Sequence, residues 1–168
     1  MDIVTISGIF TAITTGAKFL KESTQIAAEI SKNGTQIVDN ITTAYGKIKS
    51  FFIRDKKIDE SAFAFLESNP NNEVAKNAIK QTIESVLDDD TARNNELAEN
   101  IAQILEAINN IPQNSAEELQ RTVGLDLRES KSALVKYKEV VAEKGTTAID
   151  ARKSEGATFE GESLRTKK

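Results

Sequence analysis

Residues 3–17 read IVTISGIFTAITTGA and contain no charged side chain, and this stretch decides the kind of fold that we expect. Apolar residues recur at positions 3, 6, 10, 13, 17 and 20, and this alternation of three- and four-residue steps is the period of a helix with one apolar face. Several of the residues are β-branched, which lowers helix propensity, so packing against partners must hold the helix. The stretch therefore predicts a helix within an all-α bundle.

The same helical period continues over most of the chain, and polar clusters interrupt it. Asn33-Gly34 is the expected break between the first two helices, although one long helix with a weak point there is the alternative. We then expect a third helix in two pieces over 59–67 and 73–88 and a fourth over 92–109. A fifth helix would run from Ser115 to about Lys144, with Gly124 able to bend it. The residues expected to face the core are Ile6, Phe10, Ile13, Ile30, Ile41, Ile48, Leu66, Ile79, Ile83, Leu97, Ile101, Ile104 and Leu105.

Two motifs indicate where helices start. Ser-Ala-Glu-Glu at 115–118 fits the capping-box pattern and predicts a helix that opens at Ser115. Asp-Asp-Asp-Thr at 88–91 predicts a turn whose carboxylates lie at the N-terminus of the next helix, where negative charge is favourable. A cation site there is disfavoured, because the run lacks the Gly and the distal Glu of a calcium loop.

Composition excludes several classes of function. The chain has 168 residues, 39% hydrophobic and 29% charged, which suits one soluble globular unit of four to five main helices. It contains no Cys, no His and no Trp, so thiol chemistry and the commonest general base and metal ligand are absent. We therefore expect no enzyme activity, no cofactor and no metal. The net charge of −4 argues against nucleic acid as a partner.

The last 24 residues differ from the rest, so we divide the chain into a helical bundle over 1–144 and a polar tail over 145–168. The tail contains three glycines, and its few apolar residues alternate weakly around Ile149 and Phe159, as in short strands. A solvated tail without fixed structure is the alternative. No Asn or Gln follows Gln120, so a cross-β stack of the tail would have no amide ladder.

The uncharged run at 3–17 has two interpretations. It is either the central helix of the bundle or a helix stored in the bundle and released into a membrane, a use that Gly8 and Gly16 favour. As a helix its fifteen residues span about 22 Å, less than the roughly 30 Å of bilayer hydrocarbon, so we expect no permanent span. The residues expected to enter the membrane are Ile3, Ile6, Ile9, Phe10, Ile13, Phe19 and Leu20.

A basic cluster is a second candidate for membrane contact. Its members, which flank the apolar stretch 51–53, are Lys47, Lys49, Arg54, Lys56 and Lys57. Such a cluster either contacts anionic lipid headgroups or is simply the polar end of a helix.

Three segments in order carry a resemblance to a known family. They are AYGKIKSFF at 44–52, AFAFLESNPNNE at 62–73 and AIKQTI at 78–83, and the acidic turn follows them. This order resembles a bacterial Bell domain, a type found with amyloid signalling motifs and likened to fungal HeLo and to plant or animal four-helix-bundle cell-death domains. The resemblance covers about residues 1–144, and its most specific piece is LESNP at 66–70.

The resemblance implies a membrane-targeting, pore-forming or membrane-perturbing effector of regulated bacterial cell death, as in antiphage immunity. The N-terminal helix would be the membrane element, and other copies of the chain would join it on activation. A matching motif on an NLR-type receptor would template the tail into an amyloid fold, so the implied partners are that receptor and membrane lipids. The implied location is the cytoplasm at rest and the inner face of the cell membrane in action. The motif residues would be Ile149, Ala151, Arg152, Gly156, Phe159 and Gly161.

A second hypothesis comes from a different class of protein. The chain would be a helical adaptor without membrane activity, with its first helix as core and its tail recruiting a partner. Leakage of liposomes separates the two hypotheses.

Overall fold

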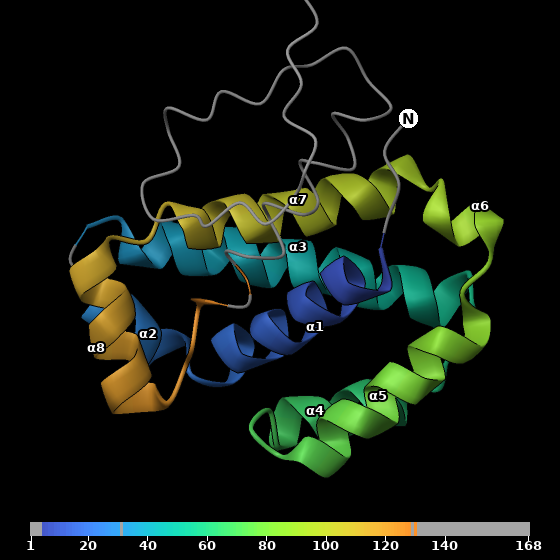
Figure 1. Cartoon of the computed structure of the whole chain (residues 1–168), viewed down its shortest axis with the longest axis horizontal. Coiled ribbons are helices and arrows are strands. Elements are labelled where there is room, and N and C mark those ends of the chain that lie inside the picture. Colours follow the sequence, from blue (N-terminus) through green and yellow to red (C-terminus); the bar gives the residue numbers. More distant parts are fainter. Residues whose placement is uncertain (1–4, 31, 129, 131–168) are drawn as a thin grey trace, which may run out of the picture.

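The computed structural model of the chain describes residues 5–30, 32–128 and 130. Over these ranges the chain forms helices and no strand, which confirms an all-α helical bundle. Eight helices follow one another there (Figure 1): α1 (Ile6–Lys21), α2 (Ser23–Glu29), α3 (Gly34–Arg54), α4 (Glu60–Ser68), α5 (Glu73–Val86), α6 (Asp89–Ala92), α7 (Asn95–Asn109) and α8 (Gln113–Val123).

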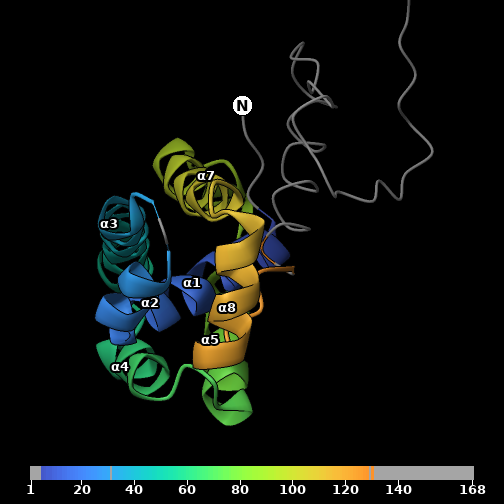
Figure 2. The same ribbon diagram turned by 90° about the vertical axis from the view of Figure 1, so that its left-hand side faces the viewer.

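Helix α1 lies in the middle of the bundle, and other helices surround it (Figures 1 and 2). The long helices α3 and α7 pack on each other and on α1, while the hairpin of α4 and α5 covers another side of α1. Helices α2 and α8 pack together at the end of the bundle where α1 finishes. Since α1 contacts α2, α3, α4, α5 and α7, the core is built around it.

Short polar side chains mark the starts of five of these helices, with Asp59 at α4 and Asp88 at α6. Thr5 caps α1, Asn72 caps α5 and Asn94 caps α7, each accepting a hydrogen bond from a backbone N–H of the first turn. Such caps satisfy N–H groups that have no partner within their own helix. The loop at 69–72 separates α4 from α5, so the predicted division into two pieces is confirmed.

Two predicted boundaries in the first two-thirds of the chain need correction. The break at Asn33 is confirmed by its left-handed φ of 56°, but the helix before it is not continuous. Glu22, with φ −113° and ψ 27°, separates α1 from α2. The carboxylates of 88–91 do not lie at the start of the 92–109 helix: Asp88 caps the separate short helix α6, and α7 begins only at Asn95.

The last predicted helix also differs from the structure. It begins at Gln113 with Pro112 at the cap position, so the prediction of a helix opening at Ser115 is wrong. Pro112 has φ −57° and ψ 147° there and supplies no side-chain cap hydrogen bond. The helix ends at Val123, because Gly124 adopts a left-handed φ of 67° and terminates it. Residues 131–144 of the predicted helix lie outside the described part of the chain.

Burial confirms most of the predicted core. Two residues near the start of α1 are the exceptions: Ile6 is 48% exposed, so its prediction is wrong, and Phe10 is only half-buried. Periodicity identifies the apolar face of a helix but does not reveal how far along the helix its partners cover that face. The confirmed residues are Ile13, Ile30, Ile41, Ile48, Leu66, Ile79, Ile83, Leu97, Ile101, Ile104 and Leu105.

Candidate functional site

Helix α1 carries most of the uncharged run, and the bundle buries most of the helix. Its only charged residues, Lys18 and Lys21, lie in the last turn. Five apolar residues of α1 have no exposed surface at all: Ile9, Ala12, Ile13, Ala17 and Phe19. In this state α1 is therefore the central core helix, and any membrane role requires it to leave its neighbours.

The two glycines of α1 have different surroundings. Gly16 faces the ring of Tyr45 on α3 so closely that no side chain fits between them. A Cβ atom at Gly8 would lie at an ordinary contact distance, 3.9 Å, from Ile101 on α7, and 3.1 Å from the hydroxyl of Thr5. Gly16 therefore permits the close approach of α1 to α3.

Tyr45 is fixed by a polar network that joins α3 to α4. Its hydroxyl donates a hydrogen bond to Glu67 Oε1 at 2.9 Å, and Lys49 Nζ donates to the same oxygen at 3.0 Å. Burial, the charge of Glu67 and this hydrogen bond together raise the pKa of Tyr45 well above its ordinary value of 10. The ring that Gly16 packs against is thus held in one position.

The end of α1 is held by a set of contacts that we call the polar anchor: Lys18, Lys21, Glu22, Ser68 and Asn71. Lys18 is 3% exposed, and its Nζ donates to Asn71 Oδ1 at 2.9 Å. The same Nζ lies 3.0 Å from Glu22 Oε2, an ion pair without hydrogen-bond geometry. Lys21 Nζ donates to the backbone carbonyl of Ser68 at 2.5 Å. The anchor therefore fastens α1 to the loop between α4 and α5.

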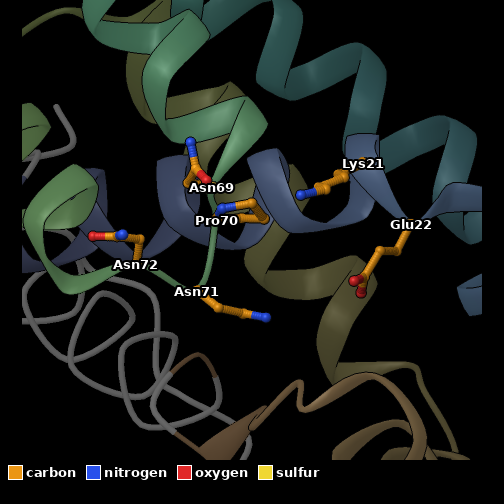
Figure 3. Close-up of a pocket in the computed structure, with 6 residues that line it drawn as sticks. All are labelled: Lys21, Glu22, Asn69, Pro70, Asn71 and Asn72. Atoms are coloured by element: carbon orange, nitrogen blue, oxygen red, sulfur yellow. The ribbon is translucent and has the colours of Figure 1, made fainter.

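A pocket of about 330 Å³ opens beside the polar anchor (Figure 3), lined by Lys21, Glu22, Asn69, Pro70, Asn71 and Asn72. Lys21 reaches toward the loop, whereas Asn72 points away toward α5, whose first turn it caps. The positive charge of Lys21 and the negative charge of Glu22 cancel in the net charge of the lining. The pocket thus has no net charge that would select an ion.

One side of α1 is incompletely covered, and we call it the open face: Ile6, Ser7, Phe10, Thr11 and Thr14. Each of the five is exposed or half-buried. Lys80 of α5 lies over one of these residues: its Nζ is 5.9 Å from the centre of the Phe10 ring. The open face is uncharged and belongs to the run that we expected to enter a membrane.

The predicted membrane-entering residues have different positions in the resting bundle. Ile9, Ile13 and Phe19 are fully buried, Phe10 is half-buried, and Ile6 and Leu20 are 48% and 45% exposed. The predicted residues outside the described part of the chain are Ile3, Ile149, Ala151, Arg152, Gly156, Phe159 and Gly161.

The basic cluster does not form one free cationic surface. Lys49 pairs with Glu67, and Lys56 pairs with Asp88 at 2.9 Å. Hydrogen bonds from Thr91 and from Lys56 hold the pKa of Asp88 well below its usual range, and Asp88 is the cap of α6. Two members of the cluster, Lys47 and Arg54, instead line a shallow pocket of about 480 Å³ together with Thr43, Gly46, Ser50 and Glu96.

Sequence reasoning missed the polar anchor and the partners of Tyr45. A lysine that follows an apolar stretch, such as Lys18, is typical of the charged end of a helix. Nothing in the adjacent sequence indicates that its side chain is buried. The one available signal was the unusual turn at 66–70, which marks the loop that holds α1. That turn indicates the loop as one partner of the contact, but it does not indicate that Lys18 is the other partner.

Helix α1 has 16 residues and is about 24 Å long. Over the described ranges, no helix combines the length and the apolarity needed to cross a membrane. Comparisons with protein-family models, with curated proteins and with solved structures found no match to this chain.

Proposed function

We propose that the protein is a membrane-targeting, pore-forming or membrane-perturbing effector of regulated bacterial cell death. It rests in the cytoplasm as a helical bundle and acts at the inner face of the cell membrane. An NLR-type receptor with a matching motif engages the C-terminal tail, several copies cluster, and their α1 helices enter the lipid. The resemblance of residues 1–144 to Bell domains supports this proposal.

The observation that carries the proposal is the position, at the centre of the bundle, of a helix whose first twelve residues are uncharged. Residues 6–17 of α1 contain no charge, whereas each of α2 to α8 carries at least one acidic side chain. A charged side chain near the bilayer centre is costly, so α1 is the described helix that enters lipid most easily. Its open face is already uncharged before any rearrangement.

Release of α1 has a cost that keeps the resting protein inactive. The helix must break the contacts of Lys18 and Lys21 and must leave partners such as the Tyr45 ring and Ile101 without cover. Clustering of several copies offsets this cost, because neighbouring helices and lipid then cover the apolar surfaces. A helix of about 24 Å also requires local thinning of the bilayer or Lys18 reaching to the headgroups.

The experiment needs a change that spares the resting fold. Deletion of residues 1–20 is unsuitable, because it removes the buried side chains of Ile9, Ile13 and Phe19. A charge at Gly8 is unsuitable too, since that position is buried. Ser7 is exposed and is the second residue of α1, where an aspartate interacts favourably with the helix N-terminus. Ser7→Asp therefore leaves the bundle folded and places a charge inside the uncharged run.

Thr24→Asp is the matched control, because Thr24 is the exposed second residue of α2 and lies outside that run. Full-length protein with an inducible oligomerisation module after Lys168 is added to vesicles of phosphatidylethanolamine and phosphatidylglycerol. On induced clustering, wild type and Thr24→Asp should release an encapsulated dye, whereas Ser7→Asp should not. An aspartate costs about 2.5–3.5 kcal/mol per helix at the bilayer centre. Ser7 lies near the start of α1, so its aspartate must cross that centre before the helix can span the bilayer, and several helices multiply this barrier.

The adaptor without membrane activity is the second candidate, and the complete burial of Ile9, Ile13 and Phe19 favours it. Such burial is what a permanent core helix requires. If clustered wild-type protein releases no dye, or if Ser7→Asp and Thr24→Asp release it equally, α1 is not the membrane element. In the first of these outcomes the adaptor function replaces the effector function.

A further inference from the structure

The hairpin of α4 and α5 is attached to the bundle mainly through α1. Both of its helices pack on α1, whereas neither makes extensive backbone contact with α3 or α7. Figure 1 shows α3 and α7 on one side of α1 and the hairpin on the other. The large side chains that the hairpin buries belong to the apolar core that also contains the buried side of α1: Phe63, Leu66, Ile79 and Ile83. Movement of the hairpin would therefore uncover α1 and leave α3 packed on α7.

The two chain segments that connect the hairpin to the rest of the bundle lie side by side. Residues 55–59 lead from α3 into α4, and residues 87 and 88 lead from α5 to α6. An ion pair joins the two segments, since Lys56 Nζ lies 2.9 Å from Asp88 Oδ1. The hairpin thus enters and leaves the bundle at one place, which is the arrangement that a hinge requires.

The first connecting segment contains a residue with an unfavourable backbone conformation. Lys57 has a left-handed φ of 58°, which residues with a Cβ atom seldom adopt. Such a conformation persists only where its surroundings hold it, and here the next residue is fixed. Ile58 is buried, and its N–H donates to the backbone carbonyl of Phe52 at 3.1 Å. Release of Ile58 would let Lys57 return to an ordinary φ and would turn the chain that enters α4.

The polar anchor holds the opposite end of the hairpin. The loop at 69–72 joins α4 to α5 there. Lys18 of α1 donates to Asn71 Oδ1 at 2.9 Å, and Lys21 donates to the carbonyl of Ser68 at 2.5 Å. The hairpin is therefore connected by the chain at one end and fastened by side chains of α1 at the other.

Between these two ends, polar contacts attach α4 to α3. Glu67 accepts hydrogen bonds from Tyr45 and Lys49, and Glu60 Oε1 lies 3.5 Å from Lys49 Nζ. Water replaces contacts of this kind at a modest net cost when the two groups separate. The apolar interface with α1 is thus the main resistance to movement of the hairpin.

We propose that residues 60–86, which we call the lid, open as a unit about the segments 55–59 and 87–88 and thereby uncover α1. The polar anchor is the latch at the free end of the lid. Opening of the lid comes first, and separation of α1 from α3 follows. That this opening precedes entry of α1 into a membrane rests on the proposed function, whereas the movement of the lid does not.

A covalent link across the latch tests the lid, because the natural chain has no cysteine. Lys21→Cys/Ser68→Cys joins α1 to the lid through two exposed residues that are in contact. Asn77→Cys/Gln81→Cys is the matched control, since these exposed positions are neighbours one turn apart on α5, inside the lid. Both full-length variants are linked with a short bis-maleimide and compared with their unlinked forms.

Native-state hydrogen exchange measures the opening without lipid. In the unlinked proteins, the slowest amides of α4 and α5 should exchange at least about tenfold faster than those of α3 and α7, because such short helices are marginal once they leave α1. The link across the latch should remove this difference, and the link within α5 should leave it. Absence of the difference in the unlinked proteins, or its persistence in the protein linked across the latch, overturns the proposal.

Dye release from vesicles then asks whether the lid controls α1. On induced clustering, the protein linked within α5 should release dye as its unlinked form does, and the link across the latch should abolish release. Equal release by the two linked proteins overturns the control of α1 by the lid. If the clustered unlinked proteins release no dye, the proposed function fails, and hydrogen exchange alone decides whether the lid opens.

Discussion

The ring of Tyr45 occupies the space that a side chain at Gly16 would need. A Cβ atom built at Gly16 would lie 2.6 Å from Cδ2 of Tyr45 and 2.7 Å from its Cβ and Cγ. Because Glu67 holds the Tyr45 hydroxyl, the ring has little freedom to move aside. The two residues thus set how closely α1 packs on α3. Helix α1 would have to separate from α3 on release.

Gly16→Ala should therefore lower the free energy of unfolding by about 1–3 kcal/mol, the usual cost of overpacking a core. Gly46→Ala is the matched control, because Gly46 lies within α3 and a Cβ atom there meets nothing within 4 Å. That variant should gain about 0.5–1 kcal/mol, since alanine is the better helix former. Urea denaturation followed by circular dichroism measures both. Stabilisation of the two variants alike would contradict the close packing of α1 on α3.

The raised pKa of Tyr45 predicts a change of stability at alkaline pH. The folded state keeps the phenol protonated above its ordinary pKa of 10, whereas the unfolded chain ionises near 10. The contribution of Tyr45 is therefore fully present below pH 10 and is lost as the pH rises further.

Tyr45→Phe isolates this contribution. At pH 7 the variant should be less stable than wild type by about 1–2 kcal/mol, because it lacks a hydrogen bond to a carboxylate. Between pH 10 and 11 the difference should shrink, since only the wild type has a phenol to ionise on unfolding. Urea denaturation at pH 7, 9 and 11 measures the difference, and a constant gap across the series would show that the phenol is not buried against Glu67.

How much of this structure was predictable depends on how local each feature is. The stripes of α3 and α7 follow from sequence, because residues such as Ile41, Ile48 and Ile104 recur with the helical period and are all buried. Ile6 belongs to an equally regular stripe, yet it is 48% exposed. Periodicity identifies the apolar face of a helix but does not show where along the helix the packing partners end. The end of α1 at Glu22 has no Gly or Pro to mark it.

The polar anchor was beyond sequence reasoning for a different reason. The hydrogen bond of Lys18 to Asn71 joins residues 53 positions apart, and it exists only because α4 and α5 bring their loop to the end of α1. The same is true of Tyr45 and Glu67, which are 22 positions apart. Contacts between distant polar residues leave no period in the sequence, so only the folded arrangement shows them.

The tail provides a prediction about separable parts of the chain. The composition changes at Gly145, where the amphipathic period stops and glycine-spaced sequence begins. Deletion of residues 145–168 should leave the Tm within about 2 °C of wild type, because a change below roughly 0.5 kcal/mol is expected when no core residue is lost.

Deletion of residues 131–168 should lower the Tm clearly further, because it also removes residues 131–144, which the sequence pattern assigns to the helical bundle. Calorimetry of both truncations beside the full chain makes the comparison. A large loss from the shorter deletion would show that the tail packs on the bundle, contrary to the division of the chain at 144.

The polar anchor allows the resting state to be weakened at one point. Glu22 Oε2 is buried, accepts no hydrogen bond in the described part of the chain, and has Lys18 as its ion-pair partner. Lys18→Met keeps the apolar stem of the side chain but leaves that oxygen uncompensated, which should cost about 1–3 kcal/mol of unfolding free energy. Lys21→Met, which removes an exposed lysine one turn further along, should cost less than about 0.5 kcal/mol.

A double-mutant cycle separates the charge effect from lost packing. Glu22→Gln removes the charge that Lys18 compensates, so Lys18→Met/Glu22→Gln should be more stable than the sum of the single changes predicts, by about 1 kcal/mol. Strict additivity in urea denaturation would mean that the two side chains do not interact.

If α1 is the membrane element, the same Lys18→Met protein should release dye from vesicles at a lower degree of induced clustering than Lys21→Met. The reason is that weakening the anchor reduces the free energy needed to free α1 and leaves its uncharged run unchanged. Equal clustering thresholds in two variants of clearly different stability would mean that release of α1 does not limit membrane activity.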